Sequence, residues 1–305
     1  MKQKVVRWLI IAGLKVVSVL ILLLPWKIAL ATGGFLGRVA YQRLKKERDR
    51  AWNNFNLAFG DSYNDSQKNE ILKKSFENLG KSLIEVVKFS QINSRNIDRM
   101  VTFEGEACLR EAFAKGRGVV FVTGHTGNWE LMGITLSIKG YPTNVIAAPL
   151  YDSRLDRIMN QFRSLHGVQT ITRGGEKGAR KILSALKNNQ ILGLLIDQDI
   201  EAEGVFVDFF NRKAFTPSGA ASLALKSGAS VILGFIHREP GDRHVVSLTG
   251  PVPLIQQGTL EENIYANTAY FTKAIEETIK RHPDQWVWMH NRWQTRRGSA
   301  SHESS

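Results

Sequence analysis

The sequence predicts an α/β fold, in which a layered domain has a largely parallel central sheet flanked by helices, plus an N-terminal membrane-anchoring helix. Short apolar runs alternate with helical patterns over residues 118–281, and this alternation is typical of a sheet covered by helices. The first 24 residues are dominated by one apolar run. The chain has 305 residues, of which 43% are hydrophobic. It is therefore long enough to bury one large core or two modest ones.

The N-terminal apolar run extends over Val5–Leu24. At a rise of 1.5 Å per residue, a helix of this length measures about 30 Å, which is just enough to cross a bilayer. Lys15 lies in its middle and is costly in a span, but its long side chain reaches the surface if the helix lies shallow. A cleaved signal peptide is the alternative. Pro25-Trp26-Lys27 follows in place of a small-residue cleavage site, so we expect a retained anchor, either spanning or monotopic.

The net charge of +13 is concentrated near the two ends of the chain. Residues 1–50 contain 11 Lys/Arg against 2 Asp/Glu, and residues 280–297 contain 5 against 1, whereas residues 51–279 are nearly neutral. Nucleic-acid binding usually requires a basic stripe across the folded domain, so we expect no nucleic-acid partner. Basic residues beside an apolar helix favour anionic lipid head groups. Most of them follow the apolar run, which predicts that the main domain lies in the cytoplasm.

The first helix of the main domain is predicted from apolar residues at three- and four-residue spacing, such as Leu72, Phe76, Leu79 and Leu83. Later strands are short apolar runs, of which GVVFVT at 118–123 and ILGLLID at 191–197 are the clearest. The predicted helices cover residues 66–90, 128–139, 154–166, 176–188, 217–227 and 261–281. The predicted strands cover residues 118–123, 144–148, 168–172, 191–197, 230–237 and 244–249.

The segment GHTGNWE, residues 124–130, places a histidine and a carboxylate at a strand-to-helix turn. Five residues of helix would leave His125 and Glu130 about 140° apart, but Gly124 and Gly127 permit a tight turn that keeps His125 in the loop. Asn128 can then cap the helix, with Glu130 in its first turn. We expect Glu130 to reach back to one imidazole nitrogen, which would make His125 a general base for a hydroxyl nucleophile.

A second histidine, His237, also has an acid five residues later, Asp242. The two residues flank Glu239-Pro240-Gly241, a turn between two predicted strands. No pair of glycines surrounds His237, and no helix N-terminus lies behind it. We therefore interpret it as a structural hairpin connection and assign the chemistry to His125.

Four ordered blocks resemble the lipid A biosynthesis late acyltransferases, a branch of the lysophospholipid acyltransferase superfamily whose catalytic motif is a histidine with an acid five residues later. The blocks are GHTGNWE at 124–130, DQD at 197–199, VDFFN at 207–211, and HPDQWVW at 282–288 followed by HNRW at 290–293. The order is similar over nearly the whole chain. Two departures are Asn211 in place of a usual glycine, and Ala147-Ala148-Pro149 in place of a usual arginine–proline pair. The second departure concerns substrate recognition rather than reaction type.

The resemblance implies direct transfer of a fatty acyl chain from acyl-ACP or acyl-CoA to a hydroxyl of a lipid A precursor, with His125 and Glu130 as catalytic residues. No cofactor beyond this co-substrate and no metal are expected. Arg163 resembles a downstream arginine that stabilises negative charge, and Asp199 is a candidate to support His125 or a binding arginine, although a structural ion pair explains either residue equally well. The implied location is the bacterial inner membrane, with the catalytic domain on its cytoplasmic side.

The domain boundaries follow from these interpretations. Residues 1–30 are the membrane anchor, residues 31–297 the acyltransferase domain, and residues 298–305 a disordered tail. Within the domain, Arg173 with Gly174-Gly175 opens one predicted helix, and Thr216–Gly219 opens another. Helix starts attract phosphate through free N–H groups, but ordinary turns and caps explain them as well. Asn128 and Arg173 complete the candidate site residues.

Several alternatives remain at the level of sequence. The acceptor is a lipid A precursor, another glycolipid or a lysophospholipid. A membrane-anchored hydrolase would use the same histidine on water, although the chain has no GxSxG serine motif. A non-catalytic adaptor is a third class. The tryptophans of residues 286–293 form either an interfacial belt or part of the core, and the single cysteine, Cys108, is expected to pack rather than react.

Overall fold

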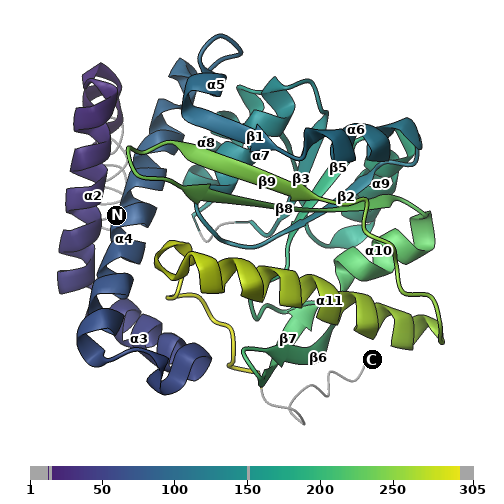
Figure 1. Ribbon diagram of the computed structural model, residues 1–305. Coiled ribbons are helices and arrows are strands. Elements are labelled where there is room, and N and C mark those ends of the chain that lie inside the picture. The colour runs from purple at the N-terminus through teal and green to yellow at the C-terminus, as the bar shows by residue number, and fades with distance from the viewer. Residues whose placement is uncertain (1–12, 14–15, 150–151, 296–305) are drawn as a thin grey trace, which may run out of the picture.

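Seven strands form one sheet, in the order β1-β9-β8-β2-β5-β3-β4. All neighbouring strands run parallel except β8 and β9, which pair as an antiparallel hairpin. This arrangement confirms the predicted fold class of a largely parallel sheet flanked by helices (Figure 1). The strands are β1 (Val101–Glu104), β2 (Val119–Thr123), β3 (Thr143–Ala147), β4 (Gln169–Thr172), β5 (Ile191–Leu195), β8 (Ser230–Arg238) and β9 (His244–Thr249).

The computed structural model describes residue 13 and residues 16–149 and 152–295. Half of the apolar run Val5–Leu24, namely residues 5–12 and 14–15, and the whole predicted tail 298–305 lie outside these residues. Among the residues described, no helix is both long and apolar enough to cross a membrane. The helices within the described residues include α2 (Trp26–Arg43), α3 (Lys45–Phe59), α4 (Asp65–Val87), α5 (Ile97–Met100), α6 (Glu106–Ala114), α7 (Trp129–Ile138), α8 (Ser153–Ser164), α9 (Gly175–Lys187), α10 (Gly219–Ser227) and α11 (Leu260–Arg281).

The sheet separates two hydrophobic cores, because successive side chains of a strand point to opposite faces. On β2, Val119 and Phe121 belong to the core that includes residues of α6 and α7. Val120 and Val122 belong to the other core, which is covered by α10 and α11. All five residues of β2 are buried. A strand buried on both faces has no amphipathic alternation, and this explains why GVVFVT is a continuous apolar run.

The predicted elements of the main domain are confirmed within a few residues, apart from the start of one helix. The helix predicted over 217–227 begins at Gly219, because Thr216 and Pro217 pair with Val205 and Gly204 in a separate two-stranded sheet of β6 (Gly204–Phe209) and β7 (Arg212–Pro217). This hairpin was not predicted, and neither were β1 and the helices α2, α3, α5 and α6. Its turn explains the departure at Asn211, which has φ +57°, because asparagine tolerates the left-handed conformation almost as glycine does.

Helices α2 and α4 pack at backbone contact, on the left of Figure 1. A Cβ atom at Gly37 would lie 2.2 Å from the Phe76 carbonyl oxygen, and one at Gly80 would lie 2.2 Å from the Gly33 carbonyl oxygen. Only hydrogen atoms fit at such contacts, so these glycines determine how closely the two helices approach.

We predict that Gly37→Val lowers the melting temperature, because the added side chain forces α2 away from α4 at a cost of about 1–3 kcal/mol. Ala31→Val is the matched control, since Ala31 is exposed on the same helix. Thermal unfolding followed by circular dichroism measures both. Equal melting temperatures for the two variants would contradict the close packing.

Candidate active site

The pairing of two parallel strands brings His125 and Asp197 together. In the register of β2 and β5, Thr123 lies opposite Leu195, and each strand is followed two residues later by one member of the pair. The His125 Nδ1 atom lies 2.8 Å from the Asp197 Oδ1 atom. A histidine and a carboxylate at the carboxyl edge of a parallel sheet occupy the usual place of a functional site in α/β folds.

Asp197 is 1% exposed and accepts hydrogen bonds from three groups. Besides the imidazole, the His125 backbone N–H and the Trp286 indole N–H each donate to Oδ2 at 2.7 Å. Burial by itself would raise the pKa of Asp197, but His125 and these hydrogen bonds outweigh it and hold the pKa well below its usual range. An ionised carboxylate only accepts, so Nδ1 carries the proton and Nε2 of a neutral His125 is free to act as a base.

The expectation that Glu130 holds the imidazole is wrong. Its carboxylate instead accepts two hydrogen bonds from the Arg163 guanidinium of α8, from Nε at 2.8 Å and from Nη2. Glu130 lies in the first turn of α7 and contacts α8. Gly124 instead lies against the end of β5, where a Cβ atom would be 3.0 Å from Asp197 Oδ2. Burial alone would lower the pKa of Arg163, but Glu130 raises it overall. Two roles were considered for Arg163, the stabilisation of negative charge and a structural ion pair. The structure shows the ion pair, with Glu130.

The turn that presents His125 is held by backbone and cap interactions. Asn128 caps α7 as expected, since its side-chain oxygen accepts from the Leu131 N–H at 3.0 Å. Gly127 has φ +56°, and a Cβ atom there would lie 2.2 Å from the Ile236 carbonyl oxygen. The loop also pairs with the segment after α11, through Gly127 N–H to Gln285 O at 2.8 Å. Glycine is therefore required at 127 by both conformation and space.

Three further side chains surround the imidazole and were not predicted from the sequence. The Gln198 amide nitrogen lies 3.2 Å from His125 Nε2 and also contacts the His290 ring. Trp129 packs edge-on against His125, with ring centroids 4.9 Å apart. Burial, together with the neighbouring His125, lowers the pKa of His290 to about 3, so His290 is neutral at physiological pH. Gln198 therefore lies within hydrogen-bond distance of both imidazole rings, His125 at Nε2 and His290.

Asp199 and Arg173 contact groups other than the His125 imidazole. Asp199 accepts from the backbone N–H groups of Gln294 and Thr295 and from the Thr295 hydroxyl, so the expectation that it supports His125 is not met. It fixes the C-terminal segment instead. Arg173 follows β4, the edge strand, which β3 and β5 separate from β2. Its backbone N–H donates to Ala147 O at 2.9 Å.

The second histidine–acid pair lies at the β8–β9 hairpin, which confirms the predicted turn between two strands. His237 does not contact Asp242: its Nε2 lies 2.8 Å from Glu239, and its ring stacks on His282 with centroids 4.0 Å apart. Asp242 accepts from Lys81 at 3.0 Å. The pair closes the β8–β9 hairpin.

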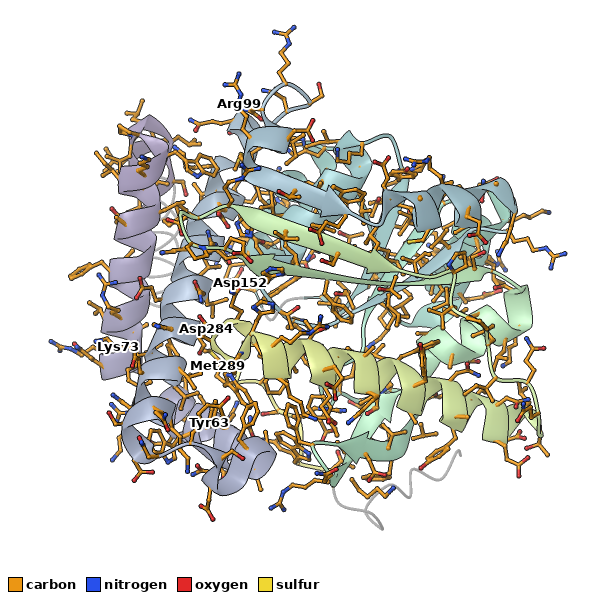
Figure 2. The ribbon with its side chains drawn as sticks, viewed as in Figure 1. Tyr63, Lys73, Arg99, Asp152, Asp284 and Met289 are labelled. Atoms are coloured by element: carbon orange, nitrogen blue, oxygen red, sulfur yellow. The ribbon has the colours of Figure 1, made fainter. Side chains whose placement is uncertain are left out.

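The C-terminal tryptophans belong mainly to the core. Trp286 and Trp288 are 1% and 0% exposed, which excludes them from an interfacial belt. Figure 2 labels Asp284 and Met289 of the same segment, which runs between α4 and the C-terminal end of α11. Arg292 is fully buried and donates to Phe215 O at 2.6 Å. The segment therefore joins the core to the site, where Trp286 binds Asp197.

This geometry agrees with the sequence comparisons. Residues 1–295 match the family of bacterial lipid A biosynthesis acyltransferases. The chain belongs to this family. The match covers His125, Asp197 and the C-terminal segment, so the whole candidate site lies within the region that defines the lipid A acyltransferase family.

Relatives of known name fall into two groups. The chain is 26% identical to the lipid A biosynthesis palmitoleoyltransferase of Escherichia coli over 276 residues, which cover 90% of this chain and 87% of that protein. It is 25% identical to the lauroyltransferase of the same organism, over 95% of this chain and 92% of that protein. It is also 31% identical to a phosphatidylinositol mannoside acyltransferase of Mycobacterium tuberculosis. That match covers 52% of this chain and only about half, 51%, of the mycobacterial protein.

We predict that Asp197→Asn lowers acyl-transfer turnover by about 10²-fold or more, since the amide cannot accept from all three donors and no longer stabilises the imidazolium. Asp199→Asn is the matched control and should lose much less, because its partners are the backbone and hydroxyl groups of residues 294 and 295. Single-turnover assays with melting curves in parallel measure both. A folded Asp197→Asn variant with wild-type turnover would refute the pairing.

Proposed function

We propose that this protein transfers a fatty acyl chain from an acyl thioester to a hydroxyl of a lipid A precursor, within a ternary complex. The observation that supports it most is the His125 imidazole, whose Nδ1 is fixed by a buried, ionised Asp197. This arrangement leaves Nε2 as the basic nitrogen and fixes the direction in which its lone pair points. The sequence contains no GxSxG motif to hold a serine nucleophile, so the base is best suited to activate a hydroxyl of the acceptor itself.

In the first step, His125 Nε2 takes the proton of the acceptor hydroxyl while the oxygen forms a bond to the thioester carbonyl carbon. The carbonyl electrons move to the oxygen, which becomes a tetrahedral oxyanion. Asp197 stabilises the imidazolium formed at the same moment. Since Gln198 lies 3.2 Å from Nε2, its amide turns aside when the hydroxyl arrives, and its N–H group is then available to the oxyanion.

In the second step, the oxyanion collapses and the carbon–sulfur bond breaks. The thiolate leaves with the proton that His125 held, so the imidazole returns to its neutral state and the ester is complete. No acyl-enzyme forms. Glu130 lies in the first turn after the loop, where it pairs with Arg163 of α8. We assign this pair to holding the acceptor or donor beside His125 rather than to moving the proton.

The choice of acceptor is supported by the relatives. Those that match along most of the chain are named for lipid A biosynthesis. A phosphatidylinositol mannoside is the second candidate, because the mycobacterial relatives show the higher identity, although over a shorter match of 162 residues. Both acceptors are glycolipids with a free hydroxyl. The proposed donors are acyl-ACP and acyl-CoA, which share the reacting thioester.

His125→Ala should lower turnover by about 10²-fold or more, because it removes the base. Glu130→Gln should lose as much or less, since it keeps the shape but loses the ion pair with Arg163. His237→Ala is the matched control and should stay nearly as active as the wild type, because its partners are Glu239 and the ring of His282.

The assay incubates purified protein with radiolabelled acyl-ACP or acyl-CoA and, in separate reactions, a lipid A precursor, a phosphatidylinositol mannoside or a lysophospholipid. An active His125→Ala beside a dead, folded His237→Ala would overturn the assignment of the base. Release of free fatty acid without transfer would identify a hydrolase, and no turnover of any donor would favour an adaptor.

The proposed site of action is the cytoplasmic face of the bacterial inner membrane. Apolar side chains are exposed along residues 16–23 and α2, including Leu20, Leu23 and Phe35. The buried Lys88 ammonium donates to the carbonyls of Ile21, Leu22 and Leu24, at the C-terminal end of the helix of residues 16–23. The apolar surface is therefore attached firmly to the domain, as a bilayer-binding element would need to be.

We predict that the intact protein sediments with membranes and is released by detergent but not by salt. Replacement of Leu20, Leu23 and Phe35 by glutamate should shift it toward the soluble fraction. Leu183→Glu is the matched control, because Leu183 is equally exposed but lies on α9. If salt alone released the wild-type protein, the attachment would be electrostatic and the apolar anchor would be excluded.

A further inference from the structure

A fully buried charged cluster lies behind the His125 loop, on the ends of α4, β8 and β9. Glu85 of α4 is 0% exposed. Its Oε1 accepts from Arg238 at 2.8 Å and from His244 at 2.9 Å, and its Oε2 accepts from the second terminal nitrogen of Arg238 at 2.8 Å. Burial alone would raise the pKa of Glu85, but His244 and Arg238 outweigh it and lower the pKa to about 2. The carboxylate is ionised at neutral pH.

Asn128 connects this cluster to the catalytic loop. Its amide nitrogen donates to Glu85 Oε2 at 2.7 Å, and its amide oxygen accepts from the Leu131 N–H at 3.0 Å. The Leu131 N–H can only donate and the ionised Glu85 can only accept, so the amide has one permitted orientation. Asn128 is 2% exposed, and no orientation with bulk water as partner is open to it. Glu85 thereby fixes Asn128, which lies between His125 and Glu130 and caps α7.

The same cluster reaches the loop by a second route. Gln285 accepts from the Arg238 backbone N–H at 2.6 Å and donates back to the Arg238 carbonyl at 2.8 Å. The Gln285 carbonyl in turn accepts from the Gly127 N–H at 2.8 Å. Adjacent residues of the loop, Gly127 and Asn128, are therefore both tied to groups around Glu85.

We propose that Glu85 is a positioning residue for the reaction, which sets the direction of the His125 imidazole by fixing Asn128 and the start of α7. The proposal rests on the proposed function, in which His125 is the base. Glu85 itself touches no reacting atom. If Glu85 served only to neutralise Arg238, neither of its oxygens would need to point at Asn128, the cap of α7. Its second oxygen serves both Arg238 and Asn128.

The test exchanges the donor and the acceptor of the Glu85–Asn128 hydrogen bond. Glu85→Gln places an NH₂ group against donors only, and Asn128→Asp places two carboxylates at a distance of 2.7 Å. Asn128→Asp loses the bond, whereas Glu85→Gln loses either this bond or those from Arg238 and His244, according to which side its NH₂ group faces. In the double variant, the new carboxamide at position 85 donates to the new carboxylate at position 128, whose other oxygen still accepts from the Leu131 N–H.

We expect each single variant to lower kcat by about tenfold or more with little change in KM, and the double variant to recover to within about threefold of the wild type. Leu72→Ala is the matched control. Leu72 is a fully buried residue of α4 in the opposite core, so its loss should lower the melting temperature without changing kcat well below that temperature. Wild-type kcat in Glu85→Gln, or a double variant no better than either single one, would overturn the proposal.

A second readout keeps the proposal testable if no acyl transfer is found. The imidazole nitrogens of His125 are followed by NMR in ¹⁵N-histidine-labelled protein, assigned with His125→Gln. The expected result is shifted His125 resonances in each single variant, their return in the double variant, and no shift in Leu72→Ala. Unmoved resonances in both single variants would refute positioning by Glu85. An inactive wild type with the expected NMR pattern would refute the proposed function alone.

Discussion

Three hydrogen bonds converge on the Asp197 carboxylate. Their donors come from distant parts of the chain, so much of the fold must form before this buried charge has its partners. An ionised carboxylate without partners in a core would cost several kcal/mol. Its donors come from the loop after β2 and from the segment after α11, so the sheet register and the C-terminal segment must both be correct for Asp197 to be satisfied. The loop that presents His125 is fixed by the same bonds. The geometry of the site and the stability of its surroundings therefore depend on the same three hydrogen bonds.

Apolar packing and buried charge have different roles here. The two cores on either face of the sheet supply a driving force that depends on area and hardly on direction. The charged groups at the carboxyl edge supply direction, because each accepts or donates along defined lines. Asp197 holds the loop from the side of β5, and Glu85 holds it from the side of α4. Between these two carboxylates the short turn from Gly124 to Asn128 has little freedom.

The sequence was sufficient for elements with a strong local pattern and insufficient for long-range partners. The apolar run of β2, the glycines beside His125 and the cap at Asn128 are local, and each was predicted correctly. Asp197 was visible at the end of β5, but its role depends on β5 lying next to β2, and strand order is not encoded in local periodicity. The same limit explains Glu130: spacing alone could not show that Arg163, 33 residues away, would take its carboxylate.

The pairing of residues 125–127 with residues 285–287 has a consequence for biosynthesis. A polypeptide emerges from the ribosome from its N-terminus, so β2 and β5 are available for folding long before Trp286 is made. The sheet can assemble on the nascent chain, but Asp197 then lacks its indole donor and the loop lacks the segment 285–287 that pairs with it. The arrangement around His125 is completed only after Trp286 has left the ribosome. A chain that terminated before Trp286 would thus lack this arrangement even if its sheet had folded.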